Sequence, residues 1–305
     1  MSDLSSTHKE FNPDNLNPQK LHALLLGGVA PRPIAFASTI DKDGRVNLAP
    51  FSYFNVFSAN PPILIFSPAR RGKDNTTKHT LDNVLEVPEV VINMVDYDLV
   101  HACSLASTDY PQGVNEFEKA GLTEVPSVTV TPPRVLESPV SMECKVLKVE
   151  SFGPNPGAGN LVFCEIKRMH FRKSVLGSDG LPDAVLLDLV ARCGGSYYTR
   201  ASKEALFEIP KPIVNLGIGV DAIPKDICTS SILTGKHLAM LGNVESLPDE
   251  TEVNDYKLIE LSELFLDYAD NGVVLELELH KHALKLLDNG NVDEAWKTLL
   301  TFNLG

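Results

Sequence analysis

Residues 63–85 change in order from an apolar strand to a basic loop and then to a helix, which restricts what the chain can form. Ile63–Phe66 is an apolar run typical of a buried strand. Leu81, Val84 and Leu85 lie at i, i+3 and i+4, which indicates one face of a helix. Small and basic residues therefore join the predicted strand to the predicted helix.

The loop concentrates positive charge before the predicted helix, which is expected to begin at Thr76 or Thr77. Its basic side chains are Arg70, Arg71, Lys73 and Lys78. A helix N-terminus offers unpaired backbone N–H groups and the positive end of the helix dipole, and both favour a phosphate. The loop therefore predicts a phosphate site. The alternative is an ordinary basic surface loop that caps a helix.

The residues before the loop predict a series of short strands. Pro33–Ile40 and Arg45–Pro50 flank Asp43-Gly44, a strong hairpin signal. Many short strands and few helices between residues 33 and 175 favour a closed barrel, because closure removes exposed edges. The fold class expected is mainly β with α.

Phe51–Ser58 interleaves polar and aromatic side chains directly after Pro50. Proline cannot donate a hydrogen bond to a neighbouring strand, so backbone N–H and C=O groups near it are free to contact something other than a strand. Ser52 and Asn55 among aromatic rings predict a strip that hydrogen-bonds the edge of a flat heterocycle. The alternative, expected for most of these phenylalanines, is that the rings pack the barrel core.

Composition excludes several classes of function. The chain has 27 basic and 40 acidic residues, a net charge of −13 and a pI near 5.1. An acidic surface repels phosphate backbones, so we expect no nucleic-acid partner, whereas one basic cluster suits a small anionic ligand. The five cysteines lie singly, which argues against disulfides and zinc, and we expect no metal. Met1–His8 is not typical of a signal peptide and no run is long enough to span a membrane, so we expect a cytoplasmic protein.

The pattern changes after about residue 205. Helices are expected after Ile223, through Leu238–Gly242, near 255–270 and 276–288, and from Val292. We expect residues 15–205 to form one barrel domain and residues 206–305 a mainly helical extension packed on it.

Several ordered motifs resemble the flavin reductase-like, FMN-binding split-barrel family, in a longer subgroup with a C-terminal extension. They include Pro31–Ile34, Asn47–Asn55, Asn60–Pro62, Lys78–Asn83, Tyr110–Thr123 and Ala191–Tyr197. His79 stands where the family usually has Asp, and the 70–77 loop is longer than is typical. The resemblance covers roughly residues 15–205 and implies a split β-barrel plus the helical extension.

The resemblance also implies a ligand site and an assembly. FMN would lie between the two subunits of a homodimer, with Lys78, Thr80 and Arg70 or Arg71 at its phosphate. The predicted cofactor-binding residues are Ser38, Ala49, Pro50, Phe51, Ser52, Tyr53, Asn55, Ser67, Arg70, Arg71, Lys78, His79, Thr80 and Asn83. Arg192 and Tyr197 are candidates for contacts with a substrate, and no catalytic side chain is identified.

Three functions follow from this resemblance. The first is an FMN-dependent oxidoreductase, similar to flavin reductases, that uses NADH or NADPH. The second is an FMN-binding electron carrier, similar to flavoredoxin, without a small substrate of its own. The third is a split barrel that has lost FMN or binds another ligand such as haem or a deazaflavin, which His79 and the longer loop leave open.

Overall fold

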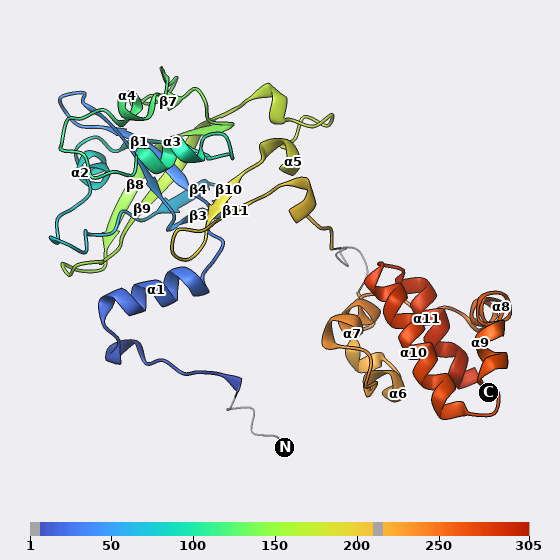
Figure 1. Ribbon diagram of the computed structural model, residues 1–305. Coiled ribbons are helices and arrows are strands. Elements are labelled where there is room, and N and C mark those ends of the chain that lie inside the picture. The colour runs from blue at the N-terminus through green and yellow to red at the C-terminus, as the bar shows by residue number, and fades with distance from the viewer. Residues whose placement is uncertain (1–6, 210–215, 305) are drawn as a thin grey trace. The chain divides into compact units, whose positions relative to one another are not determined.

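Two compact units make up the chain, Met1–Phe207 and Glu208–Gly305, in a computed structural model (Figure 1). The structure describes residues 7–209 and 216–304. The first unit contains the sheet and the second is helical. The expected packing of the helical extension on the barrel stays a prediction.

A seven-stranded antiparallel sheet forms the first unit, in the order β2-β1-β5-β8-β9-β4-β3. Its strands are β1 (Ala35–Ile40), β2 (Val46–Phe51), β3 (Phe54–Ala59), β4 (Pro62–Phe66), β5 (Glu89–Asn93), β8 (Val140–Ser151) and β9 (Asn160–Phe171). Two short pairs of antiparallel strands also lie in this unit: β6 (Glu124–Val125) with β7 (Arg134–Val135), and β10 (Val190–Arg192) with β11 (Tyr198–Arg200).

The sheet curls because its two edge strands are consecutive in the chain. Only Ser52 and Tyr53 separate β2 from β3, although these strands lie at opposite edges of the sheet. A chain covers at most about 11 Å between Phe51 and Phe54, so the two edges must approach each other. Among the described residues no pairing joins β2 to β3. The closed barrel expected from the short strands is therefore wrong, because the barrel is split between β2 and β3.

Side chains that alternate along β1 enter two separate cores. Ala35 and Ala37 pack inside the curled sheet with Phe66, Cys144 and Cys164. On the opposite face, side chains of β1 and its neighbours pack against helices; this second core contains Ile34, Phe36, Leu48, Leu99, Cys103 and Phe117. The sheet is thus covered on one face near β1, which fixes the register of this strand.

Among the described residues of the first unit there are five α-helices: α1 (Pro18–Gly28), α2 (His79–Glu86), α3 (Val100–Leu105), α4 (Glu116–Ala120) and α5 (Ala184–Leu187). The α2 helix begins at His79, two to three residues later than predicted. Thr76 instead belongs to a turn in which its backbone N–H donates to Asp74. Leu81 and Val84 are buried as expected, but Leu85 is 64% exposed, so the apolar face of α2 is narrower than its spacing suggests.

The second unit contains α6 (Lys225–Cys228), α7 (Gly235–Gly242), α8 (Glu250–Glu260), α9 (Ser262–Asp267), α10 (Gly272–Asp288) and α11 (Val292–Leu300). The single helix expected near 255–270 is wrong. A capping box between Asp249 and Glu252 starts α8 earlier, and buried Leu261 separates it from α9. The only tryptophan of the chain, Trp296, is buried here and donates to the carbonyl of Leu241 at 3.0 Å. No helix within 7–209 or 216–304 has the length and apolar character needed to cross a bilayer.

A buried carboxylate fixes the loop that precedes β7. Glu143 on β8 has no exposed side-chain surface, and its carboxylate accepts hydrogen bonds from the backbone N–H of Val128 at 2.9 Å and of Thr129 at 2.5 Å. Its Oε1 lies 2.7 Å from Nε2 of His170 on β9. Burial by itself would raise the pKa of Glu143, but the hydrogen bonds from Thr129, Val128 and His170 hold this pKa at about 2.

We expect Glu143→Gln to lower the free energy of unfolding by about 2 kcal/mol at neutral pH, because a buried charged acceptor with several donors is lost. The folded pKa of about 2 lies below the ordinary 4.5, so ionised Glu143 stabilises the fold above pH 4.5 and this contribution is lost as the pH falls towards 2. Urea unfolding, followed by circular dichroism at several pH values, measures the difference between the two proteins.

Glu150→Gln is the matched control, because Glu150 lies on the same strand in an exposed pair with Lys148. Loss of the Glu150 charge is expected to change the unfolding free energy by less than about 0.5 kcal/mol. Equal effects of the two substitutions, or a Glu143 effect that persists at pH 2, would contradict the assignment.

Candidate functional site

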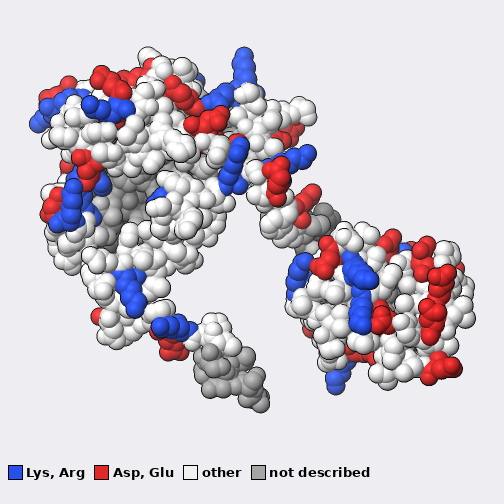
Figure 2. Space-filling model, viewed as in Figure 1, with Lys and Arg blue, Asp and Glu red and all other residues white. Residues whose placement is uncertain are grey.

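A groove lies at the split in the sheet, where β2 ends. Three cavities of about 480, 50 and 270 Å³ all include Pro50 and Phe51 in their walls. The largest extends toward the basic loop and the third toward Arg192 on β10. Figure 2 shows a hollow in the first unit with charged side chains gathered at its rim. We call the three cavities together the groove.

Backbone groups of edge strand β2 face away from β1 along the groove. The N–H of Leu48 donates to Oε2 of Glu116 at 2.9 Å, so this residue directs its backbone away from its neighbour strand. Backbone groups that point outward recur every second residue in a strand, which places Pro50 on the same side. Proline has no N–H, so the edge offers only a carbonyl acceptor at that position. The predicted free backbone around Pro50 therefore faces the groove.

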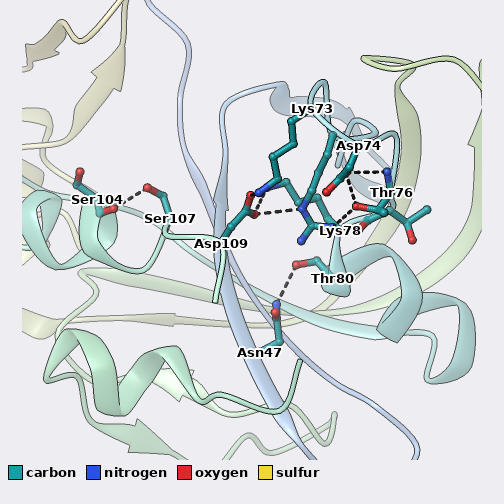
Figure 3. Close-up of polar contacts among 11 residues, drawn as sticks. Asn47, Lys73, Asp74, Thr76, Lys78, Thr80, Ser104, Ser107 and Asp109 are labelled. Carbon is teal, nitrogen blue, oxygen red and sulfur yellow. Dashed lines mark hydrogen bonds and ion pairs between the residues drawn. The ribbon is translucent and has the colours of Figure 1, made fainter. Parts of the chain in front are cut away.

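Three cations converge on one carboxylate at the end of the groove. Oδ1 of Asp109 lies 3.1 Å from Nε of Arg71 and 3.0 Å from Nζ of Lys78, and Oδ2 lies 2.8 Å from Nζ of Lys73 (Figure 3). Hydrogen bonds from Lys73 and Lys78 hold the pKa of Asp109 far below its usual range. The three nitrogen atoms thus meet around a volume occupied by a single small anionic group.

The basic loop is held from beneath by the turn between β8 and β9. Arg70 donates through its backbone N–H to Ala158 at 2.9 Å, and its Nε donates to Oδ1 of Asn75 at 2.8 Å. Asn75 in turn donates to the carbonyl of Pro154 at 2.9 Å. A side chain at Gly159 would come within 3.0 Å of the Ser67 hydroxyl, so glycine permits this close approach. Arg70 therefore anchors the loop, although it also lines the groove.

The start of α2 brings further donors to the groove. Among the residues that the structure describes, the backbone N–H groups of His79 and Thr80 make no hydrogen bond, as is usual at the first turn of a helix. The Thr80 hydroxyl accepts from Nδ2 of Asn47 at 2.9 Å. Burial, together with the charge of Arg71, lowers the pKa of His79, so this imidazole is neutral at physiological pH.

The other end of the groove is formed by an arginine and an aromatic ring. The Arg192 guanidinium lies 4.6 Å from the ring centre of Tyr198, and both line the third cavity. Cys103 lies in the same wall, and burial raises the pKa of its thiol to about 12. The thiol is therefore protonated, which excludes it as a nucleophile. A guanidinium beside an aromatic face suits a planar or anionic ligand.

Most of the predicted site residues meet in the groove. The residues brought together are Ala49, Pro50, Phe51, Ser52, Tyr53, Ser67, Arg70, Arg71, Lys78, His79, Thr80 and Arg192. Four others do not line it. Ser38 is fully buried and its hydroxyl has no described hydrogen-bond partner, while Asn83 is buried and donates to Thr39. Asn55 accepts from its neighbour Val56, and Tyr197 is 78% exposed.

The groove also contains residues that were absent from the sequence-based site, among them Asn47, Asp109, Glu116 and Tyr198. Asp109 directly precedes the motif that begins at Tyr110, so only its position beside a family motif could have indicated it. Glu116 is buried, and burial raises the pKa of its carboxyl although Leu48 donates to it. Neither acidic residue carries a local spacing signal, because their partners lie more than 30 residues away.

The groove suits a planar ligand that carries one phosphate. Convergent cations and free N–H groups lie at one end, backbone acceptors lie along β2, and apolar walls are supplied by Pro50 and Phe51. Among the described residues no cluster of His, Cys, Asp and Glu could hold a metal ion.

Comparisons with known proteins agree with this geometry. An uncharacterized protein of Aquifex aeolicus is 38% identical over 200 residues, which are 66% of this chain and all of that protein. The structure of nitrilotriacetate monooxygenase component B from Bacillus cereus is 29% identical with a TM-score of 0.62, covering 66% of this chain and 98% of that one. A protein with a split barrel domain from Shewanella frigidimarina has a TM-score of 0.56 at 22% identity, covering 67% and 99% of the two chains, and shows the fold alone.

The model of the flavin reductase like domain matches residues 27–190, which are more than half of the chain. The family resemblance and the split-barrel fold expected from the sequence are both confirmed. The chain belongs to the flavin reductase-like domain family.

Proposed function

We propose that this protein binds FMN in the groove and is an oxidoreductase that reduces flavin with NADH or NADPH. The observation that carries the proposal is the convergence of Arg71, Lys73 and Lys78 at one end of a groove whose middle is the free edge of β2. Membership of the flavin reductase-like family supports the cofactor class. The similar structure from Bacillus cereus is component B of a nitrilotriacetate monooxygenase, and a monooxygenase component supports a redox function.

The size of the cationic cluster favours FMN over a dinucleotide. Three nitrogen atoms lie within 2.8–3.1 Å of one carboxylate, and a single phosphate could make the same contacts. These three cations with Asp109 carry a net charge of +2, which matches the charge of a phosphate monoester near neutral pH. A pyrophosphate would need a second set of donors along the groove.

The chain's own residues would bind, orient and shield the cofactor. Lys78 and the N–H groups that begin α2 would hold the phosphate, while Ala49–Tyr53 would hydrogen-bond the edge of the ring system. Phe51 and the apolar wall would exclude water from one face of the bound ring system. A bound flavin supplies the hydride and electron chemistry, and the protein supplies position and local charge.

The proposal includes a homodimer with the flavin at the subunit interface. Val56 and Phe57 on edge strand β3 are 61% and 63% exposed, and they follow Tyr53 of the groove by three and four residues. Exposed apolar side chains on a sheet edge favour contact with another chain. A second copy docked on β3 would bury them beside the groove.

The test is a titration of the purified protein with FMN, followed by the change in flavin fluorescence, and an assay of NADH and NADPH oxidation with added FMN. We expect saturable binding and turnover with at least one nicotinamide. Binding without turnover by either nicotinamide would contradict the reductase and favour an electron carrier. Absence of both would overturn the FMN assignment.

Replacement of Lys78 tests the phosphate end of the groove. We expect Lys78→Ala to weaken FMN binding by about 1.5–3 kcal/mol, because a charge-assisted hydrogen bond is lost. Riboflavin, which lacks the phosphate, should bind both proteins equally. Lys167→Ala is the control, since Lys167 pairs with Glu165 on β9 outside the groove. Unchanged FMN affinity in Lys78→Ala would place the phosphate elsewhere.

Arg192 and Tyr197 are separated by the structure and can be tested against each other. We expect Arg192→Ala to raise KM for the nicotinamide about tenfold, because the guanidinium lines the third cavity and its charge suits an anionic substrate. Exposed Tyr197 lines none of the groove, so Tyr197→Ala should change KM less than about twofold. Steady-state kinetics at saturating FMN measure both values, and the reverse order of effects would refute the assignment.

A further inference from the structure

The loop that carries the cations holds Arg71 through hydrogen bonds of its own, in addition to the contact with Asp109. Nη1 of Arg71 donates to the Thr76 hydroxyl at 3.0 Å and to the carbonyl of Thr77. Asp74 fixes the turn beneath it by accepting from the backbone N–H and the hydroxyl of Thr76 at 3.0 and 2.7 Å. Hydrogen bonds within the loop therefore help to hold its shape.

Asp109, in contrast, comes from a different segment and contacts the loop through its charge. It follows α3, and its three described side-chain partners are Arg71, Lys73 and Lys78 (Figure 3). Its side chain is 36% exposed, so the carboxylate lies at the opening of the cluster. Its two oxygen atoms take the positions from which an anion would contact these same nitrogen atoms.

A phosphate at these three cations would lie against the Asp109 carboxylate. Two like charges in contact repel each other, and the repulsion is strongest where the surroundings are partly desolvated. Binding at this position therefore requires the exchange of one anion for another: the contacts of Asp109 are broken and those of the phosphate are made. The net gain is smaller than three new ion pairs would give.

We propose that Asp109 is an internal counter-anion that competes with the flavin phosphate and so keeps the flavin exchangeable. The inference rests on the proposed function. Asp109 would determine whether flavin binds as a substrate that leaves or as a permanently bound group. A reductase that delivers reduced flavin needs release, whereas an electron carrier needs retention. A carboxylate that competes only with the phosphate for the cations weakens the binding of FMN and leaves the ring contacts along β2 unchanged.

Asp109→Asn tests the proposal, because it removes the charge and preserves the shape. We expect the variant to bind FMN about tenfold more tightly and to release it more slowly, whereas its affinity for riboflavin changes less than twofold. Fluorescence titrations of the full chain with each flavin give the affinities, and rapid dilution gives the rate of release. Thermal unfolding checks that the variant is folded, and Asp109→Ala is the second variant, expected to act in the same direction.

The matched control is Asp74→Asn. It removes one negative charge from the loop that carries the cations, but Asp74 makes no ion pair among the described residues. We expect its effect on FMN affinity to be at most a third of that of Asp109→Asn. Equal effects would overturn the proposal, since they would indicate a general change of potential.

The outcomes separate this inference from the proposed function. Failure of the natural protein to bind either flavin would overturn the proposed function and the inference with it. FMN binding that is unchanged or weaker in both Asp109 variants would overturn the inference alone, because Asp109 would then order the cations for the phosphate. A parallel gain for riboflavin would also overturn it.

Discussion

The two-residue link between β2 and β3 is the constraint on which the site depends. Ser52 and Tyr53 connect strands at opposite edges of a seven-stranded sheet, so the sheet must curl until these edges approach each other. The barrel remains split there, and the backbone of β2 keeps one free side. A closed barrel would have used those backbone groups in strand pairing. The split thus turns an edge strand into the wall of a groove.

Charged side chains lie at both ends of the groove. At one end the loop after β4 brings three cations together, and the turn between β8 and β9 supports this loop. At the other end Arg192 stacks on Tyr198 and stays separate from the cationic cluster. A cofactor anchored by its phosphate would present its ring system along β2 toward Arg192. Under the proposed function, this arrangement would allow a bound flavin to react with a second, anionic substrate near Arg192.

Local sequence signals predicted β4, α2 and the basic loop between them, because each depends on residues close together in the chain. The apolar run of β4, the apolar positions Leu81 and Val84 of α2 and the cations before it were all readable from spacing. The contacts between distant segments could not be predicted from local spacing. Asp109 is more than 30 residues away in the sequence from the loop that it contacts. Ser38 is fully buried, and its burial depends on tertiary packing. The start of α2 was missed for a local reason, since Asp74 caps a turn that takes Thr76 out of the helix.

A crystal structure of the full chain with FMN would show where the phosphate and the ring system bind. We expect the phosphate to contact Lys78 and the first N–H groups of α2, with the ring system along Ala49–Tyr53 and the Asp109 carboxylate moved off the cations. A flavin phosphate bound away from residues 70–80, or a ring system away from the β2 edge, would contradict it.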